Sequence, residues 1–118
     1  MDTNALYLNL AVPDGGFTID SRGVAPKQGF AVSIYPELGE VVQPGKITAI
    51  LLDRFLAKHK SLLAKHGRCF GGWHNPETGE VCLDISVVVQ TAESARILAV
   101  QYKQIAYFDI IAGVSVNV

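Results

Sequence analysis

The residues of this chain that could take part in chemistry gather between Arg68 and Asp109. The stretch is typical of two strands joined by a turn, then a short helix and a last strand. Its candidates for contacting a ligand or a partner are Trp73, His74, Asp84, Ser86, Gln104, Tyr107 and Asp109. None of them belongs to a known catalytic motif, so we assign no catalytic residue and the sequence names no reaction.

Asp84 and Ser86 alternate with apolar residues along the expected strand Glu80–Val89. They therefore share one face of that strand, about 7 Å apart. If Tyr107 and Asp109 lie on the same face of the sheet, the four residues form a polar cluster. Two neighbouring carboxylates raise the pKa of one of them, which is how general acid–base pairs arise. A catalytic site, a binding groove and a solvated polar face all remain open.

The histidines and cysteines do not have the spacing of a metal site. His59 and His66 are two helical turns apart, whereas chelating pairs are four residues apart, and no CxxC motif is present. We expect no metal and no cofactor. A thiol could pair with a nearby base as Cys69 with His66 or Cys82 with His74. However, neither cysteine is expected at a helix N-terminus, where the pKa of a thiol would fall. We expect both to be reduced thiols.

Gly71 and Gly72 precede Trp73 within the first strand of the expected hairpin. They do not belong to a phosphate-binding loop, and glycines within a strand often mark a bulge or a close approach of another chain. Trp73 fits either an exposed interface anchor or a lid on one end of the core. With a four-residue loop over Asn75–Thr78, Cys69 faces Asp84 and Cys82 faces Gly71, a register that forms no disulfide.

Length and composition predict a single α+β domain over residues 1–118, because a chain of this size buries enough surface to fold alone. A mostly antiparallel sheet of five or six strands is expected, packed by two helices. The expected helices are Ile47–His66, with Gly67 after its end, and Ala92–Lys103, with Thr91 as N-cap. The clear strands are expected at Leu6–Val12, Phe30–Tyr35, Arg68–Trp73, Glu80–Val89 and Gln104–Ile110. Three short stretches are optional further strands: Phe17–Asp20, Glu40–Val42 and Ser115–Val118.

The charge and the apolar content of the chain limit the classes of partner that it can bind. The net charge is −1 and its signs are interspersed, which argues against a nucleic-acid partner. The one basic stretch, Lys58 to Arg68, suits the end of a helix, although an anion contact stays open. Apolar residues, counted with glycine and without tyrosine, make up about 55% of the chain, above the usual 45–50%. This excess predicts a partner surface, a homodimer in particular.

The pattern GGW…GEVCLDIS…SARILAV…QIAYFDI is similar to one in small proteins of phages, prophages and other bacterial mobile elements. The resemblance covers about the C-terminal 50 residues. The residues of this chain that carry the resemblance are Gly71, Gly72, Trp73, Leu83, Asp84, Ser86, Gln104, Ala106 and Asp109. No chemistry is assigned to that family, so the resemblance implies a genomic setting, and with it an accessory or counter-defence protein.

We therefore expect a non-enzymatic protein that binds, and thereby inhibits, a host or defence protein. The alternative is a small enzyme or ligand-binding domain with a polar site around Asp84, Ser86, Tyr107 and Asp109. A deep pocket beside Asp84 would favour the alternative, and a flat apolar patch around Trp73 the first hypothesis. The N-terminus lacks the features of a secretory signal and no stretch suits a membrane span, so we expect a cytoplasmic protein of a bacterial host cell and no membrane partner.

Overall fold

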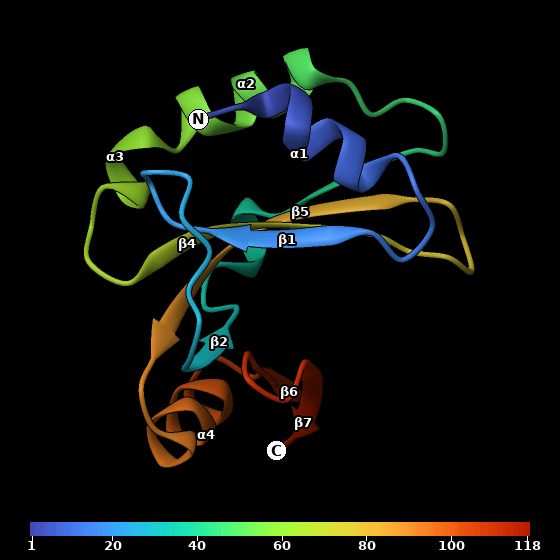
Figure 1. Ribbon diagram of the computed structural model, residues 1–118. Helices are drawn as coiled ribbons and strands as arrows, with labels where there is room; N and C mark the ends of the chain where they lie inside the picture. Colours follow the sequence, from blue (N-terminus) through green and yellow to red (C-terminus); the bar gives the residue numbers. More distant parts are fainter.

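Seven antiparallel strands form one sheet, and the helices pack against it (Figure 1). The computed structural model describes all residues from Met1 to Val118. The elements in chain order are α1 (Thr3–Leu10), β1 (Gly16–Ile19), β2 (Phe30–Val32), the 3-10 turn η1 (Pro36–Leu38), β3 (Glu40–Val42), α2 (Ala49–Lys58), α3 (Lys60–Leu63), β4 (Arg68–His74), β5 (Val81–Val89), α4 (Ala92–Gln101), β6 (Ala106–Asp109) and β7 (Val114–Asn117). The predicted α+β class is confirmed, with more strands and helices than expected.

The long strand β5 organises the sheet, whose strand order is β1-β4-β5-β2-β6-β7. β4 pairs with β5 along its whole length, from Arg68 opposite Val87 to His74 opposite Val81. The other edge of β5 is shared: β3 pairs with its first residues and β2 with its last. Both β5 and β6 are therefore interior strands with neighbours on both sides.

The alternation of side chains along β5 places two hydrophobic cores on the same face of the sheet. Val81, Leu83 and Ile85 belong to the first core, which α1, α2, α3 and β4 complete. Val87 belongs to the second core, together with Val32 of β2 and residues of α4. A single apolar stripe with a period of two thus serves both cores.

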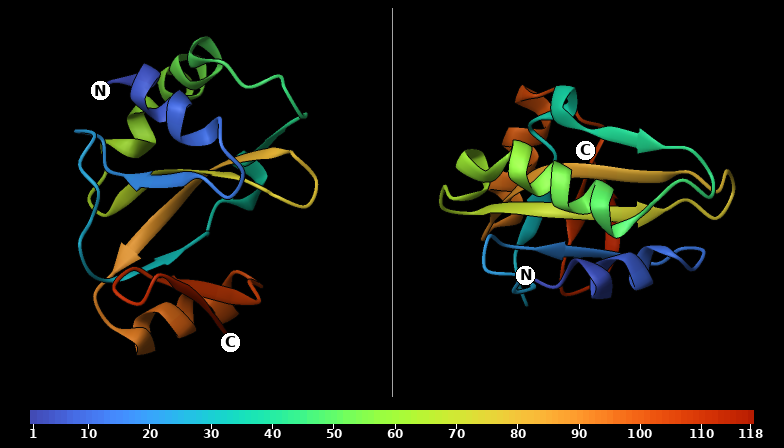
Figure 2. Two further views of the ribbon diagram at one scale, coloured as in Figure 1. Left: turned by 45° about the vertical axis from the view of Figure 1, so that its right-hand side comes forward. Right: turned by 90° about the horizontal axis from the view of Figure 1, so that it is seen from above.

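The sheet is strongly bent between these two cores. Helices α1, α2 and α3 lie above the β1–β4–β5 part, whereas α4 lies at the opposite end with β6 and β7 (Figures 1 and 2). Because all the helices cover the same face, the other face has no helical layer. The bend brings that open face of β1 and β4 opposite the open face of β6 and β7, which creates the concave surface described below.

The first element is a helix and not the strand predicted over Leu6–Val12. The apolar residues at every second position include Leu6 and Leu10, which are four residues apart and also share one face of a helix. Both are buried, while the side chain of Leu8 is 66% exposed. Asp2 stabilises the helical form, because its carboxylate accepts hydrogen bonds from the backbone N–H groups of Asn4 and Ala5.

The predicted continuous helix Ile47–His66 is interrupted. Thr48 caps α2 by accepting a hydrogen bond from the N–H of Leu51, and α2 ends at Lys58. His59 leaves the helical conformation, with φ −110° and ψ 18°, and α3 follows. The ring of His59 is buried against Phe55, 4.6 Å between ring centroids. Its Nε2 has no hydrogen-bond partner, and burial lowers its pKa.

The predicted hairpin is confirmed, but its register differs by two residues. The loop between the last paired residues, His74 and Val81, holds six residues and not four, with Gly79 at φ 75°. Cys69 therefore faces Ser86 and Cys82 faces Trp73. A shift by two leaves every side chain on its predicted face, so the grouping of Asp84 with Ser86 survives the change.

Candidate functional site

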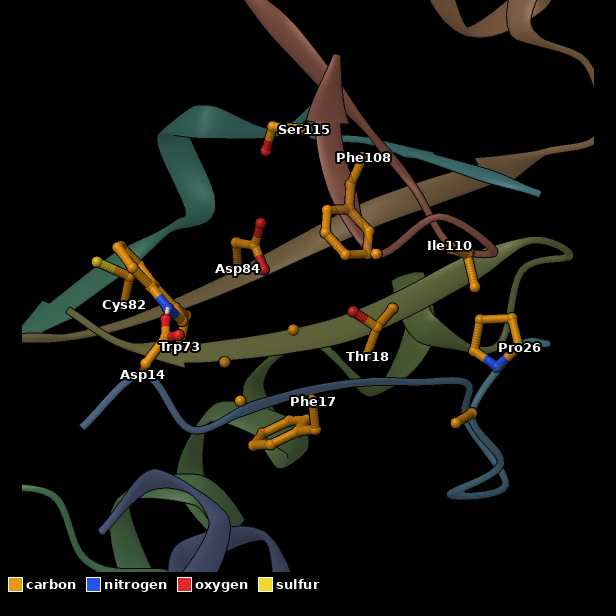
Figure 3. Close-up of a pocket in the computed structure, with 15 residues that line it drawn as sticks. Asp14, Phe17, Thr18, Pro26, Trp73, Cys82, Asp84, Phe108, Ile110 and Ser115 are labelled. Atoms are coloured by element: carbon orange, nitrogen blue, oxygen red, sulfur yellow. Dashed lines mark hydrogen bonds between the residues drawn. The ribbon is translucent and has the colours of Figure 1, made fainter. Parts of the chain in front are cut away.

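The open face of the bent sheet holds a half-open groove of about 830 Å³ (Figure 3). Strands from both ends of the sheet line it, because the bend places β1 and β4 across from β6 and β7. Its lining residues are Asp14, Gly16, Phe17, Thr18, Ala25, Pro26, Gly71, Gly72, Trp73, Cys82, Asp84, Phe108, Ile110, Gly113 and Ser115. The volume lies within the range of about 300–1,000 Å³ typical of ligand sites.

Asp84 is the charged residue on the floor of the groove. Gly71 lies opposite Asp84 in the β4–β5 pair, and a Cβ atom on this glycine would overlap the Oδ1 of Asp84. The absence of a side chain on Gly71 therefore leaves room for the carboxylate of Asp84. The only ion pair in the chain joins Arg22 and Asp20, and no hydrogen bond within the chain reaches the carboxylate of Asp84. Burial raises the pKa of Asp84, because a carboxylate loses hydration there.

Trp73 forms one wall of the groove, on the face of β4 opposite the first core. Its side chain is 42% exposed, and its indole Nε1–H donates a 2.8 Å hydrogen bond to Asp14 Oδ1. The turn that carries Asp14 is itself fixed to β4: Asp14 N–H donates to the carbonyl of His74, and His74 N–H donates to that of Gly15. Trp73 is therefore an oriented, half-exposed aromatic ring, which suits an interface anchor better than a lid on the core.

Phe108 forms the opposite wall. In β6 it pairs with Ala31 on one side and with Ser115 of β7 on the other, and its ring is 38% exposed. Figure 3 shows Asp84 between Trp73 and Phe108, with Thr18 of β1 facing the same space. The groove thus combines two aromatic walls, a floor that includes Gly71 and Gly72, and one carboxylate without a partner.

Ser86 extends the groove inward. It is buried, opposite Cys69, and lines a hollow of about 220 Å³ that shares Asp84 and Phe108 with the groove. Asp84 and Ser86 are thus brought together as the alternation along β5 predicts.

The other half of the predicted polar cluster lies on the opposite face. Tyr107 borders the small hollow, but its ring packs edge-on against Phe30 in the second core, 5.7 Å between centroids. Asp109, two residues along, accepts a hydrogen bond from the N–H of Ala112 in the turn before β7. The side chains of Tyr107 and Asp109 therefore lie on the opposite face of the sheet from that of Asp84, and an acid–base pair of the two carboxylates is not formed.

His74 and Gln104 have structural contacts. The Nδ1 of His74 lies 2.8 Å from the carbonyl oxygen of Leu10, a contact that joins β4 to the end of α1. Gln104 lies in the turn after α4: its N–H donates to the carbonyl of Ala99, and its side-chain amide donates to the carbonyl of Tyr102. Neither residue lines the groove.

Both cysteines are free, and their thiols are held in the protonated form. Burial raises the pKa of Cys69 to about 11. Burial also raises the pKa of Cys82, and the nearby carboxylates of Glu80 and Asp84 add to this effect. A thiolate, the nucleophilic form, is therefore disfavoured at both positions. No three His, Cys, Asp or Glu side chains are close enough to bind one metal ion, and no helix has the length and hydropathy to span a bilayer.

Sequence reasoning missed Asp14, Thr18, Phe108 and Ser115 as parts of the site. Each lies in a segment whose own pattern is unremarkable for a turn or strand, and the four meet only because the sheet bends. Phe108 carried a weak signal, an aromatic residue on the opposite side of its strand from Tyr107.

Comparisons with models of protein families, with curated proteins and with solved structures found no match for this chain. The resemblance to mobile-element proteins therefore stays a prediction.

Proposed function

We propose that this protein is a non-enzymatic binding protein that holds an extended segment of a partner protein in the groove of its bent sheet. The observation that carries the proposal is the shape of the groove: it lies beside Asp84, but it is half-open along the sheet and not a deep pocket, and Trp73 and Phe108 form its walls. Exposed aromatic rings are frequent anchors of protein interfaces. Gly71 carries no side chain, which leaves room on the floor of the groove for the carboxylate of Asp84.

The resemblance to proteins of bacterial mobile elements supports a host or defence protein as the partner. Occupation of the groove by a functional segment of that protein would inhibit it by competition. A protein of 118 residues is large enough to present one such surface on a rigid sheet.

Blocking the groove from its rim tests the proposal. Ser115 is exposed and lines the groove, so Ser115→Trp should fill it and weaken partner binding at least about tenfold. Val114 is also exposed, but it is the neighbouring residue of β7 and its side chain points to the other face. Val114→Trp is therefore the matched control and should retain the partner. Pull-downs from a bacterial lysate with the wild type, Ser115→Trp and Val114→Trp are compared by quantitative mass spectrometry of the retained proteins.

Equal recovery of every retained protein with Ser115→Trp and Val114→Trp would contradict the groove as the binding surface. Folding of both variants is checked by their thermal unfolding, because a change in Tm shared by both would point to a general effect of the added ring.

We also propose a homodimer. Large exposed apolar side chains are frequent near the C-terminus of the chain, where Ile105 is 84% and Ile111 75% exposed. β7 is the last strand of the sheet, and its sequence VSVN holds no lysine or proline to protect an unpaired edge. A two-fold pairing of β7 edges would cover both features.

Multi-angle light scattering at micromolar concentration tests the dimer, and we expect a mass twice the 12.7 kDa of one chain. Val116→Lys places a charge in the middle of β7 and should return the mass to that of the monomer. A wild-type protein that elutes at 12.7 kDa would rule out this association and leave the apolar residues for another partner.

A small-ligand site around Asp84 and Ser86 is the second candidate function. The observation in its favour is the cavity volume beside a carboxylate that has no partner. With Tyr107 and Asp109 on the other face, this alternative is reduced to two of its four residues. Native mass spectrometry of the purified protein distinguishes it, because a retained small ligand adds to the mass of the chain.

A further inference from the structure

We infer that the groove selects a segment carrying an arginine side chain, with its guanidinium group on the Asp84 carboxylate and its stem between Trp73 and Phe108. This inference rests on the proposed function and adds to it the chemistry by which the partner is recognised. It assigns a role to Asp84 that no contact within the chain supplies.

The charge balance of the groove is the first argument. Two carboxylates, Asp14 and Asp84, are among its lining residues, whereas no lysine, arginine or histidine lines it. Asp14 already accepts the indole N–H of Trp73. The carboxylate of Asp84 has neither an ion pair nor a hydrogen bond within the chain. A partly buried carboxylate without a partner costs free energy, and a cation that enters the groove removes this cost.

The shape of the groove favours a guanidinium over an ammonium group. Trp73 and Phe108 present exposed aromatic rings on the two sides of Asp84 (Figure 3). A planar guanidinium stacks on such rings and donates two parallel hydrogen bonds to one carboxylate. Because Gly71 lies beneath the carboxylate, no side chain of β4 competes for its Oδ1.

The raised pKa of Asp84 gives the interaction a pH dependence with a defined sign. The cation binds the ionised carboxylate, so bound arginine should lower the pKa of Asp84. Affinity should then fall as the pH decreases through that pKa, since the protonated form lacks the charge.

The experiment uses small probes and the whole chain. N-acetyl-arginine-N-methylamide is titrated into isotope-labelled protein, and NMR follows the Asp84 carboxyl and the backbone signals of Gly71 and Trp73. The citrulline analogue, which has nearly the same shape but no charge, is the control probe. We expect the arginine probe to shift these signals and to lower the pKa of Asp84, and the citrulline probe to do neither. Asp84→Asn should weaken arginine binding by about tenfold or more.

Asp53→Asn is the matched control variant, since Asp53 is an exposed carboxylate on α2, outside the groove, and its removal should leave the titration unchanged. Equal shifts by the arginine and citrulline probes, the absence of any shift up to the solubility limit, or full binding by Asp84→Asn would each overturn the inference. These outcomes are separate from failure of the proposed function, which would appear as partner retention by Ser115→Trp.

Discussion

Replacing Phe70 by alanine is expected to lower the free energy of unfolding by about 3–5 kcal/mol. Phe70 is completely buried at the centre of β4. Its ring stacks on Phe55 of α2 at 5.1 Å and meets Phe17 of β1 edge-on at 5.0 Å. The substitution therefore opens a cavity where a helix and two strands meet. Because small domains are stable by only about 5–15 kcal/mol, this is a large fraction of the total.

Chemical denaturation monitored by circular dichroism measures this loss. Phe108→Ala is the matched control, because it removes the same side chain from a half-exposed position on the groove face. We expect a much smaller loss there, and a weaker affinity for the partner. Equal destabilisation by the two substitutions would show that the ring of Phe70 does not hold the first core together.

The fold class could be predicted because β4, β5 and α4 carry clear local patterns. The alternation from Val81 to Val89 and the capping residue Thr91 act over a few residues, so they can be recognised without knowledge of the fold. The start of the chain illustrates the limit. A spacing of two between leucines also contains a spacing of four, and the choice between strand and helix was made by Asp2 and by packing on the first core.

The candidate site was predictable only in part for a related reason. Asp84 and Ser86 share one strand, so alternation alone places them together. Whether Tyr107 joins them depends on which residues of β6 point to the same face of the sheet as Asp84. Strand β2 lies between β5 and β6 and decides this, because Ala31 pairs with both Val88 and Phe108. That pairing puts Phe108 in the groove and Tyr107 in the second core. The bend that closes the groove is a property of the whole sheet and has no local signature.

Substituting alanine for Gly71 is expected to cost about 1–3 kcal/mol, since the new Cβ would overlap the Oδ1 of Asp84 and force the carboxylate to move. The same substitution in an Asp84→Ala background should cost at least about 1 kcal/mol less, because the overlapping oxygen is gone. Denaturant unfolding of the four proteins measures this coupling. Gly71→Ala alone should also weaken binding of the arginine probe, as the carboxylate is displaced from the groove floor.

Gly39→Ala provides the control for an added methyl group. A Cβ atom on Gly39 would meet its nearest neighbours at 3.4 Å, an ordinary contact, so its effect should be small and additive with Asp84→Ala. Additivity of Gly71→Ala with Asp84→Ala would mean that the glycine is present for some reason other than room for the carboxylate. A coupling energy confined to the Gly71–Asp84 pair would instead show that the absence of a side chain on Gly71 keeps the carboxylate of Asp84 in a position where it can bind a ligand.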